Sequence, residues 1–312
     1  MEQVLRGYLE HICGRENVRE NVELSTKTTF RIGGPARFFV VVKSKEKLAR
    51  LVSALLFIEY PWRIIGGGSN ILASDRGFEG VVIRLGFCEI IENGNFVYAD
   101  AGASLAGLCK RAVELGQGGL EFACGIPGTV GGAVRGNAGA FGSCVGEHIV
   151  IVDVLRGGEI VSVEARECGF GYRRSAFKRN GDIILGAYFH LQSAPPEEIR
   201  KRMEELGERR RASQPAGASA GSVFKNPETA SALLFSKTFM TAETRTSAGE
   251  MIERAGLKGV RVGGAEVSRA HGNFIVNVGG ATSGDVEALV RVVRKRVREM
   301  FGVRLALEIE RF

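Results

Sequence analysis

The stretch Gly125-Ile-Pro-Gly-Thr-Val-Gly-Gly-Ala-Val-Arg-Gly-Asn-Ala-Gly-Ala-Phe141 has six glycines among 17 residues and a single charge. So few side chains cannot hold a segment together by packing, but they let a ligand come close to the backbone. Successive N–H groups that point into one concavity bind anions such as phosphate. A flexible surface loop is the alternative. The apolar residues Ile126, Val130 and Val134 favour a binding loop for a phosphate-bearing cofactor.

A second glycine-rich stretch, Gly66-Gly-Gly-Ser-Asn70, follows a predicted strand. In a dinucleotide-binding Rossmann unit such glycines would open a long amphipathic helix. Here they lead instead to another predicted strand, Val81–Leu85, so the Rossmann interpretation is rejected. The chain also has no Gly-Lys dipeptide, which excludes a P-loop.

The composition limits the classes of protein to which the chain can belong. Its 312 residues suffice for about two domains. The net charge of +7 suits an anionic substrate or cofactor, although it would also suit nucleic acid. Six cysteines without a Cys-x-x-Cys pair, and four histidines, argue against a metal site. We expect reduced thiols in a cytoplasmic protein without a membrane-spanning segment.

The hydrophobic pattern predicts an α+β fold, because short strands mix with separated helices. Helices are predicted at Val4–Ile12, after Ser44, after Ser104, and at Glu197–Ala212, Glu250–Ala255 and Ser283–Phe301. Strands are predicted at Phe38–Val42, Val81–Leu85, Phe96–Asp100, His148–Leu155, Ile160–Val163, Ile183–Leu191, Phe274–Val278 and Val303–Ile309. Phe30 and Ile32 also alternate with polar residues as in a strand. The basic run Arg209-Arg210-Arg211 is interpreted as a solvated helix face.

Five motifs in order resemble the UDP-N-acetylenolpyruvoylglucosamine reductase (MurB) family, and the resemblance covers the chain from Thr28 to its end. The motifs are Gly66-Gly-Gly-Ser-Asn70, Gly125–Ala133 with Asn137-Ala-Gly139, Gly171-Tyr-Arg173, Gly221-Ser-Val-Phe-Lys-Asn-Pro227, and Gly256-Leu-Lys-Gly259 with Gly263-Gly-Ala265. One glycine loop would be weak support, whereas five motifs in the same order are specific.

The resemblance implies a PCMH-type (vanillyl-alcohol-oxidase) FAD-binding region of two subdomains over residues 1–205. It implies a smaller α+β substrate-binding domain over residues 206–312. The implied reaction passes a hydride from NADPH through non-covalent FAD to UDP-N-acetylglucosamine enolpyruvate, which gives UDP-N-acetylmuramate for peptidoglycan. The implied partners are these small molecules, with neither nucleic acid nor membrane, and we expect a monomer.

Site residues are carried over motif by motif. Ser222 matches the family's proton donor, Arg173 the residue that holds the substrate carboxylate, and Glu308 the acidic residue near the C-terminus. The FAD candidates are Gly67, Gly68, Ser69, Asn70, Thr129, Gly132, Asn137 and Ala138. The substrate candidates are Tyr172, Lys225, Asn226, His271 and Asn273. From the residues alone, each catalytic candidate would be read as an ordinary turn residue or surface charge.

The chain departs from the family pattern at Glu228–Ser247, an insertion whose apolar residues predict packing on the substrate domain. Arg135-Gly136 also stands where many relatives have bulkier residues. The sequence is also compatible with two other functions. A PCMH-type oxidase could carry its flavin covalently on His148 or Cys144. A basic nucleic-acid-binding protein would show steeply salt-dependent binding and no chromophore.

Overall fold

The computed structural model describes residues 2–93, 96–227 and 246–312 of the chain. Contacts divide the chain into two compact units, and each is described by itself. Unit 1 comprises Met1–Val22, Ala36–Gly67 and Glu79–Arg210, and unit 2 comprises Glu23–Pro35, Gly68–Phe78 and Arg211–Phe312. Two N-terminal segments therefore pack with the C-terminal part. The division at residue 205 expected for the functional domains stays a prediction.

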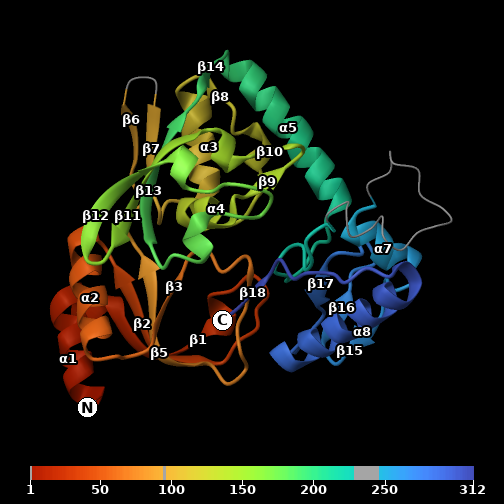
Figure 1. The fold of residues 1–312 in the computed structure, drawn as a ribbon, viewed down its shortest axis with the longest axis horizontal. Helices are drawn as coiled ribbons and strands as arrows, with labels where there is room; N and C mark the ends of the chain where they lie inside the picture. Colours follow the sequence, from red (N-terminus) through yellow and green to blue (C-terminus); the bar gives the residue numbers. More distant parts are fainter. Residues whose placement is uncertain (1, 94–95, 228–245) are drawn as a thin grey trace. The chain divides into compact units, whose positions relative to one another are not determined.

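Unit 1 is built on two sheets (Figure 1). The first has the strand order β1-β2-β5-β3, and its strands are β1 (Val18–Glu23), β2 (Pro35–Val42), β5 (Phe78–Leu85) and β3 (Trp62–Ile65). The second has the order β12-β11-β13-β7-β6, and its strands are β12 (Glu159–Glu164), β11 (Ile149–Arg156), β13 (Ile183–His190), β7 (Phe96–Asp100) and β6 (Ile90–Asn93). Both sheets contribute side chains to one hydrophobic core.

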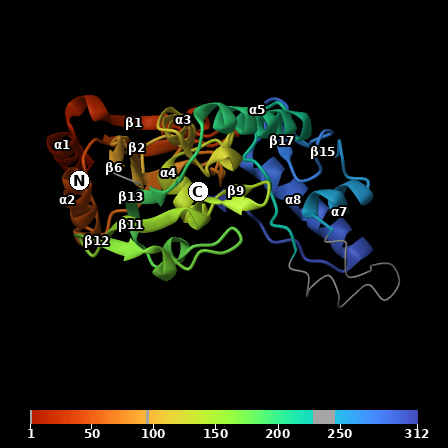
Figure 2. The same cartoon turned by 90° about the horizontal axis from the view of Figure 1, so that it is seen from above.

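Helices cover both sheets of unit 1. They are α1 (Glu2–Cys13), α2 (Lys45–Phe57), α3 (Leu105–Glu114), α4 (Val130–Gly136) and most of α5 (Pro196–Ser213). Helices α1 and α2 lie side by side near the N-terminus (Figure 2), and α4 packs on β13 and β7. The short strand pairs β9 (Gly139–Ala140) with β10 (Ser143–Cys144) and β8 (Gln117–Gly118) with β14 (Gln192–Ser193) complete the unit. The side chains of Ser44 and Ser104 cap α2 and α3, as expected.

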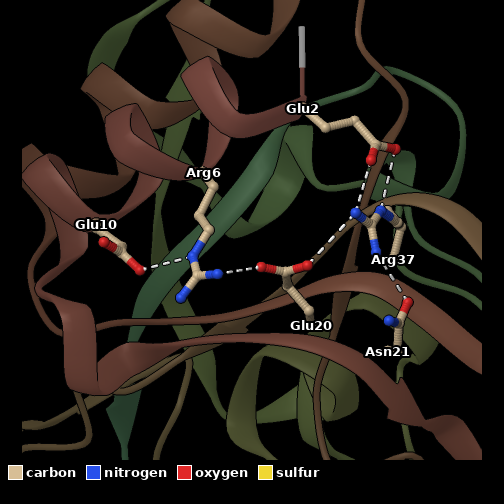
Figure 3. A network of polar contacts seen from close by, with 6 residues as sticks. All are labelled: Glu2, Arg6, Glu10, Glu20, Asn21 and Arg37. Atoms are coloured by element: carbon tan, nitrogen blue, oxygen red, sulfur yellow. Dashed lines mark hydrogen bonds and ion pairs between the residues drawn. The ribbon is translucent and has the colours of Figure 1, made fainter.

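An exposed ion network ties α1 to the first sheet (Figure 3). The Arg37 guanidinium on β2 donates Nη2 to Glu2 Oε2 at 2.6 Å and lies 3.4 Å from Glu20 Oε2 on β1. Arg6 continues the network, with its Nη1 2.8 Å from Glu20 Oε1 and its Nε 2.9 Å from Glu10 Oε1. The bond from Arg37 lowers the pKa of the Glu2 carboxyl.

Unit 2 packs its longest helix, α8 (Ser283–Phe301), on β15 and β16 of a small antiparallel sheet. The remaining elements are α7 (Ala248–Arg254), β4 (Ile71–Leu72), β15 (Arg261–Val262), β16 (Ala265–Val267), β17 (Ile275–Asn277) and β18 (Glu310–Arg311). Phe30, Ile32 and Leu72, all at most 5% exposed, belong to the same core cluster as the apolar face of α8. This burial explains why the two N-terminal segments pack in unit 2.

A carboxylate from one of these N-terminal segments also caps α8. Asp75 accepts the Ser283 N–H at 2.8 Å, the Ser283 hydroxyl at 2.7 Å and the Gly284 N–H at 3.3 Å. Thr282 and Asp285 add a capping box at the same helix end. These bonds satisfy backbone donors that an α-helix cannot satisfy internally.

Two strand predictions are wrong. The alternation of Phe30 and Ile32 is real in burial, but residues 27–34 form turns and irregular backbone. There the Thr28 hydroxyl donates to the Ile32 carbonyl and the Asn277 amide donates to the Phe30 carbonyl, so side chains replace a strand partner. Val303–Ile309 is likewise not a strand. It makes an isolated bridge at Leu307, and β18 follows it.

The other elements confirm the predicted pattern, with bounds that agree to within a few residues. Strand β7 and helix α8 have the predicted bounds. The predicted strands His148–Leu155 and Ile160–Val163 correspond to β11 and β12, which form a hairpin across Gly157 and Gly158, both at positive φ. The predicted insertion Glu228–Ser247 lies outside the described residues except for Thr246 and Ser247. Among the described residues, no helix is long and apolar enough to cross a bilayer.

Candidate functional site

The two glycine-rich stretches come into backbone contact within unit 1. A Cβ added at Gly67 would lie 2.7 Å from the Gly128 Cα, and one added at Gly66 would lie 2.6 Å from Thr129 Oγ1. Real Cβ atoms do not approach other atoms so closely, and therefore only glycine lets these loops meet. Residues that are more than 50 positions apart in the sequence thus form one surface.

At the start of α4, three backbone N–H groups of the predicted binding loop are bonded within the protein. The N–H groups of Val130 and Gly131 donate to the carbonyls of Ala103 and Ala101, each at 2.9 Å. The Gly132 N–H donates to Thr129 Oγ1 at 3.3 Å, which makes Thr129 the N-cap. Because these three donors are bonded within the protein, the first turn of α4 contributes close backbone approach, and the loop's role in binding a phosphate-bearing cofactor stays a prediction.

The outer side of this loop is nevertheless open. A Cβ added at Gly132 would have Thr129 Oγ1 as its nearest neighbour, at 3.6 Å, and one added at Gly136 would have nothing within 4 Å. A flat ring or a phosphate could therefore reach the backbone without meeting a side chain. The chain's residues fit a flavin cofactor in this respect.

Asn137 is a joint between three loops. It is 3% exposed and has a positive φ of 44° at the end of α4. Its Nδ2 donates to the Gly171 carbonyl and its Oδ1 accepts the Gly146 N–H, both at 2.9 Å. The adjacent Ala138 bonds through its N–H to Ala133 and through its carbonyl to Val145. Both ends of the Asn137 amide are thus engaged with backbone.

The Gly171 held by Asn137 opens the turn that carries Tyr172 and Arg173. Gly171 and Arg174 exchange two backbone hydrogen bonds of 3.0 Å, which makes a two-residue hairpin. Arg173 occupies the third turn position with a φ of 53°, a conformation that costs a non-glycine residue about 1–2 kcal/mol. Its guanidinium lies 5.4 Å from the exposed Tyr172 ring. Strain at an arginine is typical of a functional turn.

Arg210 is a candidate that the sequence analysis missed. The Arg209-Arg210-Arg211 run was expected to be solvated, but the Arg210 side chain is partly buried, and its Cδ would lie 3.0 Å from a Cβ added at Gly125. Burial is the main cause of a lowered pKa at Arg210; Cys124 opposes the shift and the charge of Arg173 adds to it. Two guanidinium groups beside a glycine loop favour an anionic ligand. The only sequence signal for Arg210 was the position of the three arginines near the end of α5. The hydrophobic periodicity of the helix does not distinguish Arg210 from its two neighbours.

In unit 2, three separate segments meet around Ser222. The Val223 carbonyl accepts the Glu308 N–H at 2.8 Å, and the Ala306 carbonyl accepts the Lys225 N–H at 2.9 Å. The Asn70 side chain donates to the Glu308 carbonyl at 3.2 Å, and the Asn70 carbonyl accepts the Glu310 N–H. Ser222, Glu308 and Asn70 were predicted from distant motifs, and unit 2 brings their backbones together.

The last residues of the second glycine-rich stretch, from Gly68 onward, belong to unit 2. Gly68 is buried with a φ of 64°, and its carbonyl accepts the Thr29 N–H at 3.1 Å. A side chain on Gly68 would collide with the backbone at Lys27 and Thr28. Ser69 follows half-buried. Glycine is therefore required at position 68 for conformation as well as for space.

The predicted substrate residues of unit 2 take part in its internal structure. The Asn226 Oδ1 accepts the Ala248 N–H at the start of α7. The Asn273 amide bonds to Phe224, and the His271 Nδ1 accepts the Asn273 N–H at 3.1 Å. Burial lowers the pKa of His271. Lys225, which precedes Asn226, is half-buried.

The residues considered for covalent flavin attachment are also placed in unit 1. The His148 ring stacks on Phe122 at a centroid distance of 6.0 Å and fills the space beside Gly119. Burial lowers the pKa of His148. Cys144 pairs with Gly139, and burial raises the pKa of its thiol. A raised pKa disfavours the thiolate that attachment would require.

Family models match both parts of the chain. The FAD binding domain model matches residues 36–164, and the model of the C-terminal domain of UDP-N-acetylenolpyruvoylglucosamine reductase matches residues 213–312. The reductase of Carboxydothermus hydrogenoformans is 41% identical over 297 residues, covering 94% of this chain and 93% of the relative. The reductase of Pseudothermotoga lettingae is 41% identical over 289 residues, covering 92% of this chain and 95% of the relative.

A solved structure agrees with these relatives. The crystal structure of MurB from Thermus caldophilus superposes with a TM-score of 0.79 at 38% identity, covering 95% of this chain and 99% of that one. The predicted α+β class with a PCMH-type FAD-binding region is confirmed. The chain belongs to the UDP-N-acetylenolpyruvoylglucosamine reductase (MurB) family of FAD-dependent oxidoreductases in peptidoglycan synthesis.

Proposed function

We propose that this protein reduces UDP-N-acetylglucosamine enolpyruvate to UDP-N-acetylmuramate with NADPH as the reductant. When bound, FAD supplies the redox chemistry by accepting a hydride from NADPH and delivering it to the enolpyruvyl double bond. One hydride and one proton then add across that bond, so the ether-linked enolpyruvyl group becomes a lactyl group. The FAD-contacting residues proposed are Gly67, Gly68, Ser69, Asn70, Thr129, Gly132, Asn137 and Ala138.

We assign the proton to the Ser222 hydroxyl. Hydride addition leaves negative charge on the neighbouring carbon, which is basic enough to take a proton from an ordinary hydroxyl. Arg173 binds the substrate carboxylate bidentately and stabilises the charge that spreads onto it. Glu308 orients and polarises the same carboxylate. Tyr172, Lys225 and Asn226 contact the remainder of the nucleotide sugar.

One observation carries the proposal most strongly. The carbonyl of Val223, next to Ser222, accepts the Glu308 N–H at 2.8 Å. Two residues proposed on independent motifs, 86 positions apart, therefore lie on hydrogen-bonded backbone segments. For Arg173, the support is its positive φ and its closeness to Arg210, which makes its surroundings favourable for an anion.

The test follows the visible spectrum of the FAD-loaded protein under anaerobic conditions. The flavin band should bleach with NADPH and return with the enolpyruvyl sugar. We expect Ser222→Ala to keep the first step and to slow the second by about a thousandfold, a loss in the range seen when a general acid is removed.

Ser219→Ala is the matched control, since it removes a hydroxyl three residues away in the same segment. It should reoxidise at the wild-type rate. Reoxidation of the Ser222→Ala flavin at the wild-type rate would rule out Ser222 as the proton donor. A yellow protein whose band ignores the sugar altogether would overturn the proposed substrate.

A further inference from the structure

Asn273 in unit 2 acts on the Ser222 segment as a neighbouring strand would. It is 5% exposed, and its amide bonds to both backbone groups of Phe224: Oδ1 accepts the N–H at 3.0 Å and Nδ2 donates to the carbonyl at 2.8 Å. The Asn273 carbonyl also accepts the Val223 N–H at 2.8 Å. Three hydrogen bonds from one residue therefore hold the two positions after Ser222.

The same alignment continues through Ser222 itself. Ser222 and Phe274 form an isolated antiparallel bridge, one step beyond the Asn273 contacts. Val223 and Phe224 are each 1% exposed, so water does not replace these bonds if they break. Loss of the Asn273 side chain would leave two buried backbone groups unsatisfied at the base of the Ser222 loop.

His271 in turn sets the conformation of Asn273. Its Nδ1 accepts the Asn273 N–H at 3.1 Å, which assigns the neutral ring with its proton on Nε2. The ring packs edge-on against Phe274 at 5.0 Å and closely against Gly249, where a Cβ would lie 2.9 Å from Cε1. Protonation at Nδ1 would turn this acceptor into a donor and break the bond.

The charged groups that face His271 are an ion pair. Glu253 of α7 and Lys258 after it lie 2.6 Å apart, and the Glu253 carboxylate also accepts the Gly272 N–H. Burial is the largest influence on the imidazole and lowers its pKa, Glu253 raises it, and Lys258 lowers it again. The net effect keeps the ring neutral at neutral pH.

We propose that Asn273 is the positioning residue for Ser222, and that neutral His271 holds Asn273 in the conformation this requires. This inference rests on the proposed role of Ser222 as proton donor. It assigns Asn273 and His271 to the loop rather than to the nucleotide sugar, since the Asn273 amide and the His271 Nδ1 are already engaged. Neither residue touches the reacting atoms in this role.

The experiment separates the two half-reactions of the FAD-loaded enzyme by anaerobic stopped-flow. Asn273→Ala should keep the rate of flavin bleaching by NADPH. It should slow reoxidation by the enolpyruvyl sugar about a hundredfold, because misplacement of a reacting group by about 1 Å has an effect of that size.

Asn277→Ala is the matched control in the same unit. The Asn277 Oδ1 accepts the N–H groups of Gly279 and Ala281, and its Nδ2 donates to the Phe30 carbonyl, so loss of this side chain removes no bond to residues 222–224. The Asn277 N–H donates to the Ala218 carbonyl, and this backbone bond remains in the variant. The variant should lower the melting temperature and leave the ratio of the two rates unchanged. A fall of both rates together in Asn273→Ala would overturn the proposal.

A second pair of variants tests His271 and does not depend on Asn273→Ala folding. His271→Asn places an amide oxygen near the position of Nδ1, whereas His271→Ala removes the acceptor. Reoxidation should be about tenfold faster in His271→Asn than in His271→Ala, as one hydrogen bond corresponds to about a factor of ten. The wild type should also lose reoxidation rate as pH falls, and His271→Asn should lack that loss.

The outcomes distinguish this inference from the function on which it rests. If Ser222→Ala reoxidises normally, the proton donor is wrong whatever the other variants do. If Ser222→Ala is slow but Asn273→Ala and His271→Ala reoxidise normally, the positioning role alone is wrong. An acid loss of rate that persists in His271→Asn would remove His271 from the proposal.

Discussion

Each compact unit has a loop with proposed site residues that one buried asparagine holds, but the two asparagines hold their loops differently. Asn137 in unit 1 reaches two loops, at Gly146 and Gly171, with one amide. In unit 2, both hydrogen bonds of the Asn273 amide go to the backbone of Phe224, as the bonds of a neighbouring strand would. The first joins segments that share no sheet, and the second lies next to the isolated bridge between Ser222 and Phe274.

The comparison indicates that a bridging asparagine side chain contributes most to stability where no other hydrogen bonds connect the segments. In unit 2, the bonds of Val223, Lys225 and Glu308 support the same loop. In unit 1, the Tyr172-Arg173 turn depends on Asn137 and on the Ser175 hydroxyl, which donates to the Arg135 carbonyl at 2.7 Å. We therefore expect the larger loss of stability at Asn137.

The largest effect should come from Asn137→Ala. It leaves the Gly146 N–H and the Gly171 carbonyl unsatisfied and forces alanine into positive φ, which together should lower the free energy of unfolding by about 3 kcal/mol. Asn137→Gly removes the same bonds without the backbone strain and should cost about 1 kcal/mol less. Urea unfolding of the three proteins measures the difference. Equal losses at Asn137→Ala and Asn273→Ala would break the comparison.

A somewhat smaller loss of stability is expected at the polar cluster of Lys45, Tyr98 and Asp100, which directly precedes Ala101 in the chain. Lys45 Nζ donates to the Tyr98 hydroxyl at 2.7 Å and lies 3.0 Å from Asp100 Oδ1. Burial raises the pKa of Tyr98 to about 12, and these bonds raise that of Lys45. Tyr98→Phe should lower stability by about 1–2 kcal/mol.

The Tyr98→Phe variant also tests whether unit 1 transmits the loss to its glycine loop. Asp100 is followed by Ala101, whose carbonyl accepts the Gly131 N–H. FAD titration followed by fluorescence should therefore show weaker binding as well as a lower unfolding midpoint. Unchanged FAD affinity with reduced stability would confine the effect to the core.

Both units should lose stability in acid through one histidine each. Burial lowers the pKa of His148 in unit 1 and of His271 in unit 2, so the folded chain favours the neutral rings. The unfolded chain protonates below about pH 6.5. This contribution to stability is full above that pH and is lost as pH falls through the lowered pKa values.

Unfolding midpoints measured between about pH 7 and pH 5 test this expectation, which is modest in size. His271→Asn should flatten part of the decline and leave the part due to His148. A decline that His271→Asn does not change would show that unit 2 does not limit acid stability.

The smallest effect is expected at the exposed network of Figure 3. Arg37→Ala removes the contacts with Glu2, Glu20 and Asn21, but water and salt already screen these groups. The melting temperature should change little at low ionic strength and not at all in about 1 M salt. A loss comparable to that of Asn137→Ala would show that the buried joints are not the dominant polar contacts.

The local pattern determined much of this protein. Apolar periodicity and capping residues specified α8 and α2, because a helix satisfies its own backbone and needs only one apolar face. The glycines within residues 66–68 and 125–132 indicated that another group could come close to the backbone there. The order of five motifs identified the family, and composition alone could not have done so.

Tertiary structure alone decided which distant segments share a unit. Phe30, Ile32 and Leu72 are buried with the C-terminal core, and Asp75 caps α8, although the sequence places them in the N-terminal third. Two backbone donors at the start of α4 are bonded to the carbonyls of Ala101 and Ala103, a pairing that the glycine pattern did not predict. Contacts between remote segments also explain why the Arg210 side chain is partly buried and why the Asn273 amide bonds to the backbone of Phe224. Hydrogen bonds and burial between remote residues depend on the folded path, and local sequence does not encode that path.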